Sequence, residues 1–182
     1  MATNPIPQAP WGEYIPHVGR MTIEQFEQFP IEEGWIYELH QGRILVMPGP
    51  GEEHGDIQLR LGLILGNYLA AHHLGEMRGT SCYILTLPDA SEDLLCPDLS
   101  YIVPARRASM KRQGPYTVGA PDLVIEIASP NDTHPEAATK TAIYLRAGVQ
   151  LVWNIWPNTK TSLLNCAKKL PPFAPVCNWK PD

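Results

Sequence analysis

Two carboxylates in the second half of the chain are the residues best suited to chemistry. Asp98 lies at the start of one expected strand, and Glu126 lies in the middle of another, the apolar segment 121–130. Paired oxygen ligands suit Mg²⁺ or Mn²⁺, which commonly keep several waters and act on phosphate esters. Zinc fits less well, because His54 and Cys96 form no ligand cluster. If a mixed sheet brings the two carboxylates side by side, they predict a site for a divalent cation.

The segment around Glu126 has the pattern of a buried strand. Alternate residues of a strand point to opposite faces, and both faces of this segment are apolar apart from Glu126. An ionised carboxylate in such a place costs several kcal/mol unless a cation, a lysine or hydrogen-bond donors compensate it. We therefore expect a partner for Glu126. The alternative is an edge strand in which Glu126 faces water.

A long helix is expected from about Glu52 to His73. Its apolar residues recur at the spacing of one buried stripe, formed by Ile57, Leu61, Ile64, Leu65 and Tyr68. Extended toward the N-terminus, this stripe reaches His54, which would then face the sheet near the mouth of a site. The alternative is a hydrogen-bonded core histidine.

A second helix is expected over residues 133–147. Thr133 and Glu136 have the spacing of a capping box at its start. Glu136, Lys140 and Tyr144 share one face of this helix. Lys140 can thus point back over the central strand, or it can be an ordinary exposed partner of Glu136.

The remaining segments predict one domain that is rich in strands. A hairpin is expected whose first strand carries Glu38 and whose tight turn uses Gly42. Proline-rich residues 1–20 predict an arm and residues 167–182 an irregular tail, which leaves 21–166 as the domain. The other expected elements are a helix over 22–29 and strands over 35–40, 43–47, 76–87, 96–103, 149–156 and 161–166.

The charge of the chain argues against simple, non-specific binding of nucleic acid. Its 182 residues carry a formal net charge of -5, so there is no basic field to attract phosphates. The one basic cluster consists of Arg106, Arg107, Lys111 and Arg112. Such a cluster is usually a solvated surface, but it is also the best candidate for contact with nucleic acid.

The cysteines and the apolar segments bear on the cellular location of the protein. The 4 cysteines are widely spaced, with no Cys-x-x-Cys pair, and the start of the chain lacks the apolar segment of a signal peptide. We therefore expect reduced thiols in a cytoplasmic protein. The longest apolar region, residues 59–71, is too short and too interrupted to span a bilayer. Walker, Gly-x-Gly-x-x-Gly and Gly-x-Ser-x-Gly motifs are absent, which gives little support to nucleotide binding or serine hydrolysis.

Several short motifs follow one another in a characteristic order over about residues 21–160. They are Tyr37-Glu38-Leu39 with the Gly42-Arg43 turn, Met47-Pro48, Glu53-His54, Cys96-Pro97-Asp98-Leu99-Ser100, the segment 119–126, Ser129-Pro130, Lys140, and Tyr144 with Ala147-Gly148-Val149. Each is weak alone, but their order and spacing together are fairly specific. In this respect the chain resembles the PD-(D/E)XK nuclease superfamily, and more closely its Uma-two branch of restriction endonucleases.

This resemblance implies an α/β fold, with a restriction-endonuclease-like mixed β-sheet flanked by helices. It implies that Asp98 and Glu126 are metal ligands and that the carbonyl of Ile127 completes the coordination. It also implies that Glu38 is an additional acidic group of the site.

One position departs from the superfamily pattern. The lysine of the acidic-x-Lys motif would stand at position 128, where this chain has Ala128. Lys140 resembles a migrated replacement that orients or activates the attacking water and balances charge. The candidate catalytic residues are therefore Asp98, Glu126, Lys140, Glu38 and His54.

The leading hypothesis is a Mg²⁺-dependent (or Mn²⁺-dependent) endonuclease that cleaves nucleic acid, expected to be DNA. A homodimer is expected, since two copies of one site most simply cut both strands of a duplex. One alternative is a catalytically weak descendant that keeps the fold as a binding or regulatory module. Another is an enzyme that acts on a small phosphate ester.

Overall fold

The structure is a computed structural model that describes residues 13–15, 19–130 and 132–167. Most of the expected N-terminal arm, and the tail after residue 167, therefore lie outside the described residues. The elements in chain order are β1 (Glu13–Tyr14), α1 (Ile23–Glu27), β2 (Trp35–His40), β3 (Arg43–Pro48), α2 (Glu52–Ala71), β4 (Glu76–Arg78), β5 (Tyr83–Thr86), β6 (Glu92–Leu95), β7 (Leu99–Ile102), α3 (Pro104–Ser109), β8 (Lys111–Gln113), β9 (Tyr116–Val118), β10 (Leu123–Ile127), α4 (His134–Arg146), β11 (Leu151–Trp156), a 3₁₀ helix (Pro157–Thr159) and β12 (Thr161–Cys166).

The strands form two mixed sheets, where the sequence led us to expect one. The 7-stranded sheet has the order β1-β3-β2-β6-β5-β9-β8, and the 5-stranded sheet has the order β12-β11-β10-β7-β4. The expected α/β class is confirmed. The sequence could not reveal that the strands divide between two sheets. This division depends on the direction that the chain takes after each short strand ends.

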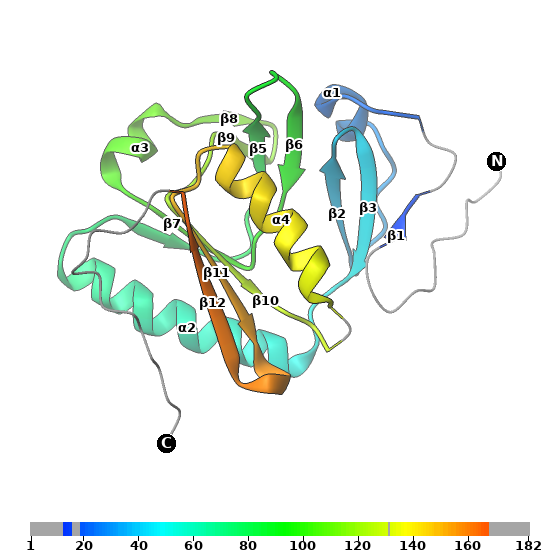
Figure 1. The fold of residues 1–182 in the computed structure, drawn as a ribbon. Coiled ribbons are helices and arrows are strands. Elements are labelled where there is room, and N and C mark those ends of the chain that lie inside the picture. The colour runs from blue at the N-terminus through cyan, green and yellow to red at the C-terminus, as the bar shows by residue number, and fades with distance from the viewer. Residues whose placement is uncertain (1–12, 16–18, 131, 168–182) are drawn as a thin grey trace.

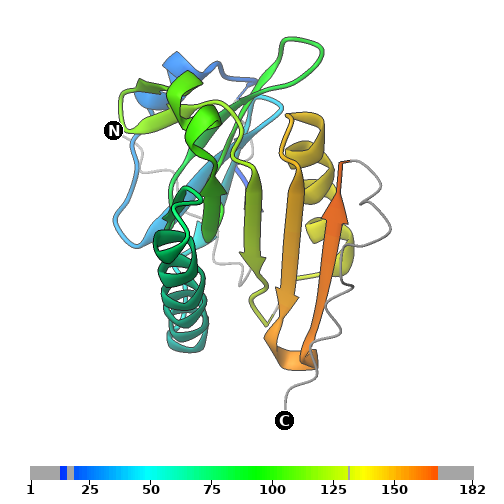
Figure 2. The ribbon, with the colours of Figure 1, turned by 90° about the vertical axis from the view of Figure 1, so that its left-hand side faces the viewer.

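The strand that carries Glu126 is central in the 5-stranded sheet. β10 pairs in parallel with β11 and antiparallel with β7. The parallel pair needs a crossover, and α4 supplies it. The helix begins where the sequence predicts, with a capping box between Thr133 and Glu136. Figures 1 and 2 show the sheet between α4 on one side and α2 on the other.

The hairpin of β2 and β3 belongs to the other sheet. Its strands pair from Trp35 with Pro48 to His40 with Arg43, as the sequence predicts. The turn residues Gln41 and Gly42 have φ values of 50° and 76°, the left-handed conformation that a two-residue hairpin turn requires. This hairpin, α1 and residues of β5, β6 and β9 form one hydrophobic core. Other residues of β5 and β6 form a second core with α4 and the 5-stranded sheet.

The long helix α2 is where the predicted burial was wrong. No residue of α2 is buried, and two members of the expected stripe are largely exposed, Ile64 at 66% and Tyr68 at 55%. The bounds of the helix agree with expectation. The apolar spacing predicted a helix correctly, but it did not show that β4 and β10 cover only part of its surface. None of the described helices has the length and hydrophobicity needed to cross a membrane.

The expectation of reduced cysteines needs correction for one pair. Cys82 and Cys96 form a disulfide across 14 residues of sequence, whereas Cys166 is free. Residue 177 lies outside the described part of the chain. β5 and β6 are antiparallel neighbours with Tyr83 opposite Leu95, so their pairing brings the two cysteines together. Disulfides are rare in the cytosol, so the cysteines no longer support a cytoplasmic location.

We expect loss of this disulfide to lower the free energy of unfolding by roughly 2–4 kcal/mol, because the bridge restricts the unfolded chain. Urea denaturation of the parent with and without dithiothreitol, and of Cys82→Ala, measures the change. Cys166→Ala is the matched control and should keep the midpoint of the parent. Identical midpoints for the oxidised parent, the reduced parent and Cys82→Ala would contradict the prediction.

Candidate active site

Asp98 lies where the pairing between β7 and β10 ends. The last pair is Leu99 with Ile125. One residue before β7, the Oδ2 atom of Asp98 accepts a hydrogen bond from the backbone N–H of Ile127 at 2.7 Å. The Asp98 side chain thus continues the ladder in place of a strand carbonyl. The N–H and C=O of one residue in a strand face the same edge, so the carbonyl of Ile127 also faces the edge where Asp98 lies.

His54 holds the other oxygen of Asp98. Its Nε2 atom lies 2.8 Å from Oδ1, and the side-chain amide of Gln58 donates to the Asp98 carbonyl at 2.6 Å. The two residues are four apart on α2 and therefore share a face. Burial lowers the pKa of His54, but the bond to Asp98 and its negative charge outweigh burial and raise it. His54 positions the carboxylate; its buried Nδ1 has no partner among the described residues.

Glu126 finds the partners that its burial demands. Tyr144 donates its hydroxyl hydrogen to Oε1 at 2.7 Å, and the Lys140 ammonium lies 3.2 Å from the same atom. Burial raises the pKa of Glu126 to about 7; Lys140 opposes this shift, while the negative charges of Asp98 and Glu38 add to it. A second positive charge beside Glu126, such as that of a bound cation, would therefore favour its ionised form.

Lys140 lies between carboxylates of the two sheets. Its Nζ atom is 2.9 Å from Oε1 of Glu38 and 3.2 Å from Glu126, and its side chain is 19% exposed. Burial lowers the pKa of Lys140, but the two carboxylates raise it above the ordinary value, which keeps the ammonium charged. Glu136 bonds instead to the N–H and hydroxyl of Thr133. Pairing with Glu136, the alternative left open by the sequence, is thus not observed.

Glu38 is the most enclosed acid of the site. Its side chain is 0% exposed, and its oxygens meet Lys140, the backbone N–H of Cys96 at 2.7 Å and Nε2 of His40 at 2.8 Å. Burial raises the pKa of Glu38, but Lys140, His40 and the N–H of Cys96 together lower it to about 2. His40 was not among the predicted site residues, although it follows Glu38 by two residues on the same strand and therefore shares its face.

The donor set fits Mg²⁺ better than a metal that needs a full protein cage. No group of three or more His, Cys, Asp or Glu side chains within the described residues is arranged to hold a metal. Mg²⁺ keeps several waters and needs only one or two carboxylates together with substrate phosphate oxygens. Both contacts of the Glu126 carboxylate in the described structure go to Oε1, so Oε2 is left for such a cation.

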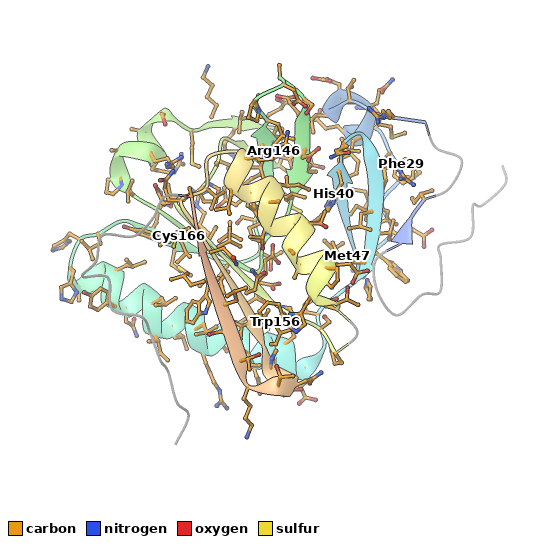
Figure 3. All side chains as sticks on the ribbon, viewed as in Figure 1. Phe29, His40, Met47, Arg146, Trp156 and Cys166 are labelled. Atoms are coloured by element: carbon orange, nitrogen blue, oxygen red, sulfur yellow. A yellow bond between two sulfur atoms is a disulfide. The ribbon has the colours of Figure 1, made fainter. Side chains whose placement is uncertain are left out.

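A cavity of about 390 Å³ lies beside Glu126. Its walls come from the hairpin, the end of β10, the first half of α4 and the last part of β11. Figure 3 shows His40 and Met47 on the hairpin side of α4, and Trp156 at the end of β11. Trp156 was also missed, because an aromatic residue in an apolar strand gives no sign of lining a cavity.

The basic cluster is not brought to these carboxylates. Arg106 donates to Asp122 at 2.7 Å, and Arg107 pairs with Glu76 at 3.0 Å. Asp122 directly precedes β10, so Arg106 lies at the opposite end of the strand from Glu126, roughly 13 Å away at the rise of an extended chain. Lys111 and Arg112 lie on β8 with exposed side chains. Their contact with nucleic acid stays a prediction.

The family of the chain follows from a comparison of its sequence with models of protein families. The family model described as "Uma2: Putative restriction endonuclease" matches residues 23–168. The chain belongs to the Uma2 family. The family resemblance inferred from the short motifs is therefore confirmed.

Other comparisons bear on the fold. A solved structure described as "a putative nuclease belonging to DUF820 from Anabaena variabilis ATCC 29413" is similar, with a TM-score of 0.68, 20% identity and 82% of each chain covered. At this identity the match shows a shared fold. No curated protein gives a significant match. Membership of the Uma2 family thus rests on sequence, and the mixed α/β fold is shared with this solved structure.

Glu38 should make the stability of this Uma2 chain depend on acid pH. Its pKa in the folded chain is about 2, below the ordinary value of 4.5. Its contribution is thus complete above pH 4.5 and is lost as the pH falls toward 2. We expect the free energy of unfolding to fall over this window by on the order of 3 kcal/mol more in the parent than in Glu38→Gln.

Urea denaturation at a series of pH values through this window measures the difference. Glu53→Gln, which changes an exposed carboxylate of α2, is the matched control and should follow the parent. Parallel pH profiles for Glu38→Gln and the parent would show that Glu38 is not held ionised by its partners.

Proposed function

We propose that the chain is a Mg²⁺-dependent endonuclease that hydrolyses phosphodiester bonds of nucleic acid. The observation that supports this best is the position of the Lys140 ammonium, 3.2 Å from Glu126. The lysine of the superfamily pattern is missing from the segment of Glu126, where Ala128 takes its place. Family membership supplies the reaction class. The geometry supplies the Lys140 ammonium beside the Glu126 carboxylate, whose Oε2 atom is left for a cation.

Each residue of the site has a proposed part in the reaction. Asp98, Glu126 and the carbonyl of Ile127 would hold the cation, which when bound offsets negative charge on the phosphate and the leaving oxygen. Lys140 stays protonated between its two carboxylates, so it donates to the attacking water or to a phosphate oxygen and does not act as a base. His54 keeps Asp98 in place through its 2.8 Å contact.

A binding or regulatory module that keeps the fold is the second candidate. The acidic net charge of -5 favours it, as does the use of Arg106 and Arg107 in ion pairs. The endonuclease and the binding module share the same fold. They differ in whether bond cleavage follows binding.

The decisive experiment combines Mn²⁺ calorimetry with cleavage of a labelled oligonucleotide in Mg²⁺. We expect Asp98→Ala and Glu126→Ala to lose both the Mn²⁺ heat and cleavage. Lys140→Met should keep Mn²⁺ binding but cleave roughly 10²–10³-fold more slowly, as expected when one charged group is removed from the transition state. Lys160→Met, which changes an exposed lysine, should match the parent.

Two outcomes would count against the proposal. Unchanged Mn²⁺ heats in Asp98→Ala and Glu126→Ala would remove these residues as ligands. Normal Mn²⁺ binding by a parent that leaves every oligonucleotide intact would favour the binding module.

The contact with DNA proposed for the basic cluster can be tested by measuring how the affinity for DNA depends on salt concentration. Each phosphate neutralised on a duplex contributes about 0.9 to the log–log slope of affinity against salt. Replacing the exposed Lys111 and Arg112 with alanine should weaken binding and reduce this slope by up to about 2. Titrations of a DNA duplex at several salt concentrations, with Ca²⁺ in place of Mg²⁺, measure this slope. A variant with the slope of the parent would place the phosphate contacts elsewhere.

The expected homodimer and the cytoplasmic location stay predictions. The dimer is expected for a duplex substrate, because two copies of one site most simply cut both strands. Large apolar side chains of α2 form an exposed surface that suits contact with a second copy, with exposures of 63% for Leu59, 56% for Leu63, 66% for Ile64 and 55% for Tyr68. Light scattering of the chain in solution would measure the mass of the assembly.

A further inference from the structure

The cavity beside Glu126 is larger than a phosphate and its cation require. Its volume of about 390 Å³ falls within the range of about 300–1,000 Å³ that is usual for small-molecule sites. Glu126 and Lys140 form part of its wall. Much of the remaining wall is apolar and is formed by Leu45, Met47, Ala128, Ala137 and Trp156.

Trp156 gives this cavity an aromatic wall. The side chain is 8% exposed, and its ring centre lies 4.5 Å from that of His134. Its indole N–H has no hydrogen-bond partner among the described residues. The register of β10 and β11 pairs Glu126 with Asn154, and Trp156 follows two residues later on the same face. Trp156 and Glu126 therefore line the cavity from the same face of the 5-stranded sheet.

The charges around the cavity limit what it can accept. Asp132 and Glu136 line it together with Glu126, so a second phosphate group would meet several carboxylates. An apolar wall also gives a phosphate no hydrogen bonds. A nucleobase suits both conditions, because it is uncharged, has an apolar face that stacks on aromatic rings and carries acceptors on its edge.

We propose that this cavity binds one unpaired nucleobase of the substrate strand, beside the phosphate that the carboxylates and Lys140 act on. The substrate is then single-stranded or locally unpaired nucleic acid. The inference rests on the proposed nuclease function and adds the class of substrate. Bases within a paired duplex are stacked and would enter only after being flipped out, which costs energy.

The test compares two single-stranded oligomers of equal length, an oligothymidylate and an abasic chain with the same phosphates. Binding is measured by fluorescence anisotropy with Ca²⁺ in place of Mg²⁺. We expect the parent to bind the oligothymidylate roughly tenfold more tightly, as one stacked base allows, and more tightly than the matching duplex. Phosphate contacts alone would give equal affinity for the two single strands.

Two variants address the cavity itself, each with a matched control. Ala137→Leu fills the cavity from α4, and its control is Ala138→Leu on the exposed side of the same helix. Trp156→Phe reduces the aromatic area on which a base can stack, and its control is Trp153→Phe on the opposite face of β11. We expect Ala137→Leu to abolish the preference for the base and Trp156→Phe to reduce it severalfold, while both controls keep it.

The outcomes separate this inference from the proposed function. Equal affinity of the parent for the oligothymidylate and the abasic chain, with cleavage of nucleic acid retained, would overturn the base site alone. A preference that survives in both cavity variants would also overturn it. Failure of the parent to bind or cleave any oligonucleotide would overturn the nuclease function and the base site together. Circular dichroism of each variant confirms that it is folded.

Discussion

The site depends on one ammonium group held between two buried carboxylates. Glu38 comes from the 7-stranded sheet, Glu126 from the 5-stranded sheet and Lys140 from the helix that joins β10 to β11. Removing the Lys140 ammonium would leave two neighbouring carboxylates without their shared cation, which is strongly destabilising. The two sheets and α4 are therefore fixed relative to one another at the point where the chemistry is proposed. A site built on strands and a capped helix is also well suited to precise positioning.

Much of this arrangement follows from local sequence rules. The apolar strand around Glu126 demanded a partner, and the capping box at Thr133 placed the start of the helix that brings Lys140. Both rules concern residues close together in the chain. The sequence could not show that Glu38 and Lys140 meet, because that contact joins segments 102 residues apart (140 − 38) across two sheets.

Other features were beyond sequence reasoning for physical reasons that can be named. The cavity lined by Trp156 lies where the hairpin, β10, α4 and β11 leave space unfilled, and the pattern of residues in a strand does not reveal such space. The pairing of Cys82 with Cys96 follows from strand register, not from the spacing of the cysteines. The basic cluster is visible in the sequence, but the sequence did not show that two of its arginines pair with Asp122 and Glu76, away from the carboxylates of the site.

The most direct test of the account is the position of a divalent cation in crystals grown with Mn²⁺. The account predicts an anomalous peak within coordinating distance, about 2.0–2.2 Å, of Asp98, of Glu126 and of the carbonyl of Ile127, with Lys140 still beside Glu126. Crystals saturated with Mn²⁺ that show no peak there, or a peak bound only by other residues, would contradict it.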